Sequence, residues 1–162
     1  MSRDGGTGVG RRTFLGVLGA ATAAAGVGVG VGAVPGCGGN NGPAATPFDA
    51  GSVTDYTAPL WKVFVSNQVI VGRDSTGFFA YSAVCTHQNC DVSFCSPLSG
   101  GVTSADGTTC CGCHGSTFRG DGSVSRGPAS SPLEHFQVTV AAGRVTVNPG
   151  NIVGAGTRTP AA

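Results

Sequence analysis

Residues 85–90 read Cys-Thr-His-Gln-Asn-Cys, and residues 111–116 read Cys-Gly-Cys-His-Gly-Ser. Each segment supplies one cysteine and one histidine at short spacing, as Cys-x-His in the first and Cys-x-x-His in the second. Two thiolates and two imidazoles can close a tetrahedral zinc site, or hold a [2Fe–2S] cluster with one iron on each pair of residues. Because the chain has three histidines and two of them lie here beside cysteines, core packing does not explain the pattern.

The composition of the whole chain limits the classes of function. Its 162 residues allow one modest domain and a targeting segment. A formal net charge of +1 is not the strongly basic balance that would suggest nucleic acid, so nucleic acid is not an expected partner. Six of the seven cysteines are found from Cys85 to Cys113. In a cytosolic protein so many cysteines would indicate metal binding, whereas in an exported protein they could form disulfides.

The two segments resemble the Rieske iron–sulfur family, whose pattern is C-T-H-x-G-C followed by C-P-C-H-G-S. The resemblance covers about residues 60–149, including the Gly-Phe-Phe-Ala run at 77–80 and the Gly-Pro-Ala run at 127–129. It implies an all-β fold: an antiparallel β-sandwich with a small cluster-binding subdomain. This fold follows from the resemblance and not from the periodicity of the chain.

The resemblance also implies the cofactor, one [2Fe–2S] cluster, and its ligands. Cys85 and Cys111 would ligate one iron, and His87 and His114 the other. Imidazole ligation leaves less negative charge on its iron than thiolates do, so reduction is easier than in plant-type ferredoxins. The outer imidazole nitrogens can lose protons, which couples electron and proton transfer in the family.

Further residues take structural roles by the same resemblance. Cys90 and Cys113 would form the family's disulfide, which joins the two segments. Residues 126–132 resemble the family's proline loop, with Gly127 and Pro128 at its centre, which covers the cluster from a third side.

Several residues depart from the family pattern. Gln88 stands where respiratory members carry Leu, and Gly112 replaces the Pro between the second-segment cysteines. Ser116 is kept, whereas Phe118 replaces a Tyr of the high-potential members. Because hydroxyl hydrogen bonds to sulfur stabilise the reduced cluster, losing one of two lowers the potential within a family range of about −150 to +300 mV. We expect an intermediate value.

Cys95 and Cys110 bracket a polar, glycine-rich insertion between the two motifs. A disulfide between them would close this insertion at its base. The alternatives are two free thiols, or Cys110 competing with Cys111 as a ligand. Because Cys110 would give Cys-x-x-x-His spacing to His114, Cys111 is the preferred ligand.

The N-terminal residues 1–37 are typical of an export signal or membrane anchor. Residues 11–15, Arg-Arg-Thr-Phe-Leu, resemble the twin-arginine signal, and residues 14–34 carry no charge. Those 21 residues can cross a bilayer core of roughly 30 Å. The Val-Pro-Gly-Cys run ending at Cys37 resembles a lipoprotein cleavage box. The protein is therefore expected to be lipidated at Cys37, anchored by an uncleaved helix, or released.

The rest of the chain divides into a linker, a domain and a tail. Residues 38–59, rich in Gly, Pro and Ala, predict a flexible linker; residues 60–149 form the domain; residues 150–162 predict a mobile tail. Strands and hairpins are predicted from β-branched and aromatic runs at 61–65, 69–71, 78–84, 136–140 and 145–147. His135 is expected at the surface, and Trp61 and Tyr81 in the core or on the sheet.

The sequence favours an exported one-electron carrier without a catalytic site of its own. It would lie on the outer face of a bacterial cytoplasmic membrane or in the periplasm, and it would serve a cytochrome or another exported oxidoreductase. The alternative is the Rieske subunit of a quinol:cytochrome c oxidoreductase, with quinol as a partner; Gln88 and Phe118 favour the first role. An oxygenase-type Rieske ferredoxin is disfavoured by the export signal, and a structural zinc domain leaves the Gly-Ser after His114 unexplained.

Phe118→Tyr is the substitution that tests the assignment of the missing hydroxyl. A tyrosine hydroxyl donating to sulfur stabilises the more negative reduced cluster, so the variant should have a higher midpoint potential in film voltammetry. An unchanged midpoint would contradict the proposed role of position 118.

Overall fold

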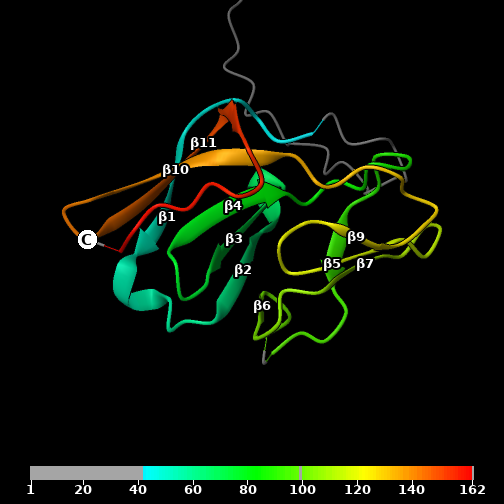
Figure 1. The fold of residues 1–162 in the computed structure, drawn as a ribbon, viewed down its shortest axis with the longest axis horizontal. Coiled ribbons are helices and arrows are strands. Elements are labelled where there is room, and N and C mark those ends of the chain that lie inside the picture. The colour runs from blue at the N-terminus through cyan, green and yellow to red at the C-terminus, as the bar shows by residue number, and fades with distance from the viewer. Residues whose placement is uncertain (1–41, 99, 162) are drawn as a thin grey trace, which may run out of the picture. The chain divides into compact units, whose positions relative to one another are not determined.

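The computed structural model describes residues 42–98 and 100–161, and its regular secondary structure is almost entirely β-strand (Figure 1). One antiparallel sheet has seven strands, in the spatial order β1 (Phe48–Ser52), β11 (Arg144–Val153), β10 (His135–Ala141), β4 (Phe78–Ser82), β3 (Val69–Arg73), β2 (Leu60–Phe64) and β6 (Thr103–Ser104). The other has four, in the order β5 (Val92–Phe94), β7 (Thr109–Cys111), β8 (Thr117–Phe118) and β9 (Val124–Arg126). Two 3₁₀ helices, η1 (Val53–Asp55) and η2 (Val65–Asn67), complete the elements. The predicted all-β, antiparallel fold class is confirmed.

The central strands of the large sheet are buried on both faces. In β3, Val69 and Val71 pack into one apolar cluster, while Ile70 packs into a second one on the opposite face. In β4, Phe78 and Phe79 divide between the two clusters in the same way. Since side chains alternate across a strand, a strand buried on both faces needs a continuous apolar run, as these two have.

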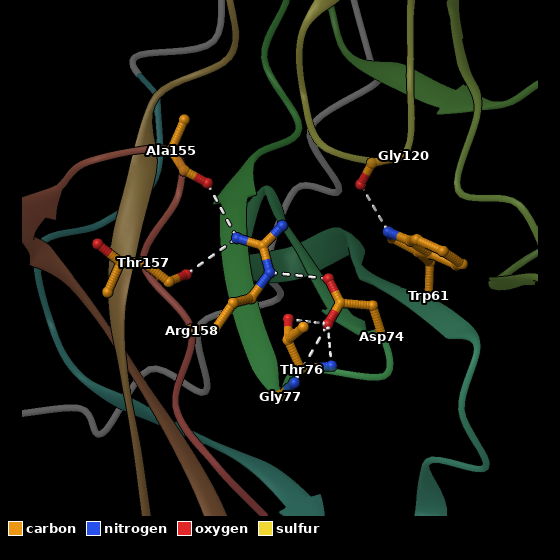
Figure 2. A network of polar contacts seen from close by, with 8 residues as sticks. All are labelled: Trp61, Asp74, Thr76, Gly77, Gly120, Ala155, Thr157 and Arg158. Atoms are coloured by element: carbon orange, nitrogen blue, oxygen red, sulfur yellow. Dashed lines mark hydrogen bonds and ion pairs between the residues drawn. The ribbon is translucent and has the colours of Figure 1, made fainter.

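Trp61 of β2 connects the large sheet to the polypeptide that carries the small one. Its indole N–H donates to the carbonyl oxygen of Gly120, in the turn between β8 and β9, at 2.7 Å (Figure 2). A side chain at Gly107 would not fit, because a Cβ there would lie 2.5 Å from the Trp61 ring. The indole is nearly buried, and it packs in the same apolar cluster as Cys85 and Cys111. This packing ties the position of the small sheet to that of the large one.

The prediction of a flexible linker through residue 59 is wrong for residues 48–59. Strand β1 pairs along β11 with a register shift between Asp49 and Gly51, and η1 follows it. Tyr56 is buried, and its hydroxyl donates to the carbonyl oxygen of Ala50 at 2.8 Å. The short, irregular strand has no clear period-2 pattern, because the register shift interrupts the alternation of its side chains.

The predicted mobile tail after residue 149 is also wrong. Strand β11 continues to Val153, and Thr159 forms two backbone hydrogen bonds with Phe78, at 2.8 and 2.9 Å. The Arg158 guanidinium donates to the Asp74 carboxylate at 2.8 Å (Figure 2). It also lies 3.8 Å above the ring of Phe79. These contacts hold the C-terminal segment against β4, even though its own sequence is rich in Gly, Thr and Ala.

His135 lies in the core rather than on the surface as predicted. Its ring packs against Tyr81, with 5.5 Å between centroids, and only 3% of the residue is exposed. Its Nδ1 lies 3.1 Å from the carbonyl oxygen of Leu133, whereas its Nε2 has no hydrogen-bond partner among the described residues. Desolvation lowers the pKa of His135, so the folded protein favours the neutral imidazole.

The expected export segment, residues 1–37 with Cys37, lies outside the described residues, and so do residues 38–41 of the expected linker. The predictions of an export signal, a membrane anchor and lipidation at Cys37 therefore stay predictions. In the part of the chain that the structure describes, no helix has the length and apolar character to span a bilayer.

The burial of His135 predicts a loss of stability in acid. Because the folded pKa lies below the unfolded value, the unfolded state binds a proton first, and the free energy of unfolding should fall as the pH drops below about 6.5. The slope contributed by one group is at most about 1.4 kcal/mol per pH unit. Denaturant unfolding of wild type and His135→Gln at pH 7.5 and 5.0 measures it: the variant should lose less stability between the two pH values. An equal loss would mean that His135 does not couple to folding.

Candidate metal centre

Two loops with the same backbone closure carry the residues that the sequence singled out. In the first, the Cys85 N–H donates to the Cys90 carbonyl at 2.8 Å, and the Asn89 N–H donates back to the Cys85 carbonyl at 2.9 Å. In the second, the corresponding bonds join Cys111 with Ser116 at 2.8 Å, and with Gly115 at 3.0 Å. Each loop therefore begins with a cysteine and closes after five residues.

Each closure needs one residue in the left-handed conformation, at the fifth position of the loop. Gly115 has φ +78°, and Asn89 has φ +55°. Glycine adopts this conformation without steric cost, and asparagine is among the residues that tolerate it best. The sequence reading missed the role of Asn89, although its place at the glycine of the C-T-H-x-G-C pattern was a usable signal.

Cys85 and Cys111 are the two reduced cysteines of the described residues, and both are buried. Desolvation is the largest effect on Cys85 and raises the pKa of its thiol, and the adjacent Cys111 raises it further. The His87 backbone N–H and the Ser116 hydroxyl act in the opposite direction, because they hydrogen-bond to the Cys85 sulfur and favour the thiolate. A buried sulfur pair of this kind gains a strong partner when a metal replaces its protons.

His87 and His114 lie beside each other at the outer end of the loops. Their ring centroids are 4.8 Å apart, with the ring planes at 84°. His87 is half-buried, and its Nδ1 is buried with no hydrogen-bond partner in the part of the chain that the structure describes, whereas His114 is exposed. An imidazole nitrogen buried without a partner is costly, unless a group outside the protein chain meets it.

Both expected disulfides are present. Cys90 and Cys113 join the two loops, with 6.6 Å between their Cα atoms. Cys95 and Cys110 join the ends of the insertion, with 5.2 Å between Cα atoms. The sulfurs of Cys90, Cys111 and Cys113 all lie within 4.8 Å of one another, but only Cys111 among these three has a free thiol.

A third loop, residues 127–132, is hydrogen-bonded to both of the others. The Ala129 N–H donates to the Ser116 hydroxyl oxygen at 2.9 Å, in a buried position. The Thr86 hydroxyl donates to the Ser131 carbonyl at 2.6 Å. Gly127 and Pro128 of the expected proline loop are exposed.

The residues expected to tune a cluster occupy different surroundings. Ser116 is fully buried; since its oxygen accepts from Ala129, its own proton is free to point at the Cys85 sulfur. Phe118 is also fully buried, opposite Thr109, whose hydroxyl has no partner among the described residues. Gln88 is exposed at the tip of the first loop. Position 116 thus supplies a hydroxyl that can point at the Cys85 sulfur, whereas position 118 supplies an apolar ring without a hydroxyl.

This donor set fits a [2Fe–2S] cluster. It offers two buried reduced cysteines in the same apolar cluster and two adjacent imidazoles, one of which has a buried nitrogen without a partner among the described residues. Sulfur and nitrogen donors in equal number are the mixed set that distinguishes such centres from the four-cysteine ferredoxins. The residues that would hold the cluster are therefore Cys85, His87, Cys111 and His114.

Comparison with known proteins identifies the same kind of domain. The family model described as "Rieske [2Fe-2S] domain" matches residues 51–137, more than half of the chain. The cytochrome b6-f complex iron-sulfur subunit of Chlorobaculum tepidum is 29% identical over 99 residues, which cover 61% of this chain and 50% of that one. The subunit of the same name from Gloeobacter violaceus is 38% identical over 81 residues, 50% of this chain and 39% of that one. The chain thus spans half or less of the length of these two curated relatives.

Two solved structures of Rieske proteins are similar to this chain, and the one with a TM-score of 0.50 supports the fold. The plasma membrane Rieske protein from Synechocystis is 25% identical, and the match covers 62% of this chain and 97% of that one, with a TM-score of 0.46. The apo form of a quaternary ammonium Rieske monooxygenase is 20% identical, and the match covers 68% of this chain and 35% of that one, with a TM-score of 0.50. The second likeness concerns the fold alone.

Ser116→Ala tests the hydroxyl that points at Cys85. Losing a hydrogen bond that strengthens in the reduced state by about 1 kcal/mol should lower the midpoint potential by about 40 mV for a one-electron couple. Film voltammetry measures this, with Ser125→Ala as the matched control, because the Ser125 hydroxyl bonds to Thr117 on the exposed side of the small sheet. Equal midpoints in both variants would exclude a role for Ser116.

Proposed function

The chain belongs to the Rieske [2Fe–2S] family and binds one such cluster, and from this premise we propose that it works as a one-electron carrier. When bound, the cluster supplies a one-electron redox couple. The observation that carries the proposal is the convergence of two buried thiols and two neighbouring imidazoles on one end of the small sheet. We assign Cys85 and Cys111 as the sulfur ligands, and His87 and His114 as the nitrogen ligands.

The sulfur ligands and the nitrogen ligands differ in their exposure to solvent, and this difference sets their roles. Cys85 and Cys111 pack in the apolar cluster that includes Phe79 and Tyr81, so the chain excludes water from the sulfur side. His114 is exposed, and it therefore offers a redox partner an imidazole edge at the surface. The Cys90–Cys113 disulfide joins the two loops and limits their separation, which keeps the sulfur and nitrogen donors together.

We propose export by the twin-arginine route and a place on the outer face of a cytoplasmic membrane or in the periplasm. The support is the order of charged, apolar and small residues in 1–37, with Cys37 as a candidate lipidation site. Two disulfides in the domain agree with an oxidising compartment. A pathway that exports folded proteins also suits a domain that receives its cluster before export.

Two roles compete for such a carrier. Gln88 and Phe118 favour an accessory carrier that serves another exported oxidoreductase, since both depart from the quinol-oxidising members. The curated relatives are named as iron-sulfur subunits of cytochrome b6-f complexes, and these names favour the second candidate, the Rieske subunit of a quinol:cytochrome c oxidoreductase. Purification of the tagged full chain from membranes separates them: a cytochrome b that co-purifies in stoichiometric amount supports the subunit, and its absence supports the accessory carrier.

The carrier proposal predicts a single one-electron transition. In spectroelectrochemical titration of the full chain, the visible absorption should follow a Nernst curve with n = 1, and the reduced protein should be reoxidised by a ferric c-type cytochrome with one electron per chain. Cys85→Ser should abolish the transition, because it removes a sulfur ligand, whereas Cys95→Ser with Cys110→Ser should keep it. A colourless wild-type protein purified without air would contradict the carrier role.

A further inference from the structure

Cys111 lies next to a disulfide to which it does not belong. Its sulfur and those of Cys90 and Cys113 are all within 4.8 Å of one another, and Cys90 and Cys113 are bonded. A thiolate beside a disulfide attacks it with an effective concentration far above that of any dissolved thiol. The arrangement is therefore reactive whenever the Cys111 sulfur is not otherwise engaged.

We propose that, in the chain without its cluster, Cys111, Cys90 and Cys113 form a thiol–disulfide exchange site. The Cys111 thiolate attacks the Cys90 sulfur; a Cys90–Cys111 bond forms, the Cys90–Cys113 bond breaks, and the electron pair leaves on Cys113 as a thiolate. One thiolate is consumed and one is produced, so the step needs no oxidant or reductant.

The Cys111 thiolate attacks Cys90 rather than Cys113, because the two possible product disulfides differ in whether they still cross-link the two loops. Attack on Cys113 would bridge two residues separated by a single residue and would release the first loop from the second. Attack on Cys90 keeps the two loops cross-linked. The new bridge encloses two residues fewer than the present separation of 23, so the loop-closure entropy is nearly unchanged.

Burial gives the exchange its direction. Cys111 is 2% exposed, whereas Cys113 is exposed. A thiolate is solvated poorly in an apolar core and well in water, so moving the free sulfur from position 111 to position 113 lowers its desolvation cost. The exchanged form therefore presents a reactive thiol at the surface and hides the former ligand in a disulfide.

The second disulfide is outside the reach of this reaction. Cys110 and Cys111 are consecutive residues of β7, and consecutive side chains point to opposite faces of a strand. Cys111 faces the apolar cluster, and Cys110 is linked to Cys95 at the other side. The Cys95–Cys110 bridge is thus an internal reference that should stay intact.

Cluster binding prevents the exchange if Cys111 ligates iron, so this step rests on the proposed function. A sulfur coordinated to iron is not available as a nucleophile. Once exchange has occurred, the chain lacks one ligand until the reaction reverses. We therefore infer that the cluster must be in place to keep the Cys90–Cys113 pairing, and that a surface thiol at Cys113 marks the chain that has no cluster.

Two matched variants test the exchange in the full chain. Cys85→Ser and Cys111→Ser each remove one sulfur ligand, but only Cys85→Ser keeps the nucleophile. Both are purified without air or reductant, treated with N-ethylmaleimide at pH 8, acidified and cleaved before aspartate. Cleavage at Asp74, Asp91, Asp106 and Asp121 places the six cysteines of the domain in peptides 74–90, 91–105 and 106–120, whose cross-links and labels tandem mass spectrometry identifies.

Cys85→Ser should carry at least tenfold more label on Cys113 than Cys111→Ser does, together with a Cys90–Cys111 cross-link and an intact Cys95–Cys110 bridge. Label on Cys111 with the Cys90–Cys113 bridge retained would overturn the proposal, and so would label on Cys95. If Cys85→Ser does not fold by circular dichroism, wild type stripped of metal by a chelator gives the same readout.

Wild type as purified separates this inference from the proposed function. A cluster-containing wild type with unlabelled Cys113, which becomes labelled after chelation, supports both. Labelled Cys113 in a wild type that never contained iron supports the exchange and contradicts the carrier. An iron-loaded wild type whose Cys113 stays unlabelled after chelation supports the carrier and overturns the exchange.

Discussion

The convergence of two short loops on one set of four donor side chains is the constraint on which the rest of the structure depends. Each loop closes through the same pair of backbone hydrogen bonds, and a single disulfide ties one to the other. The loops contain too few residues to fix each other by burial alone. Their geometry is therefore set by covalent bonds, by left-handed residues at Asn89 and Gly115, and by the strands that lead into them.

The large sheet supplies the rigid support for these loops. Its central strands are buried on both faces, and one face carries the apolar cluster that contains Cys85 and Cys111. Trp61 adds a directional link toward the small sheet through its hydrogen bond to Gly120, and the Arg158–Asp74 pair holds the C-terminal segment against the large sheet (Figure 2). The chemistry lies at one end of the small sheet, whereas the contacts that stabilise it come from segments far apart in the sequence.

The sequence alone predicts the candidate site better than the periphery of the fold. Ligand spacing within a loop is a local property, so the segments at 85–90 and 111–116 and the strands β3, β4 and β10 can be read directly. Strands of two or three residues, such as β8, have no measurable period. The placement of Arg158 depends on Asp74, 84 residues away, and that pairing leaves no mark on the local pattern. His135 follows the exposed Glu134, but the alternation of β10 turns it inward onto Tyr81.

The mixed sulfur and nitrogen donor set is the central claim, and hyperfine spectroscopy of the reduced protein tests it most directly. Electron paramagnetic resonance of the dithionite-reduced full chain should show a one-electron-reduced [2Fe–2S] signal, with couplings from two directly bonded imidazole nitrogens assigned to His87 and His114. A [2Fe–2S] signal without bonded nitrogen, or a colourless and silent protein that contains zinc, would contradict it.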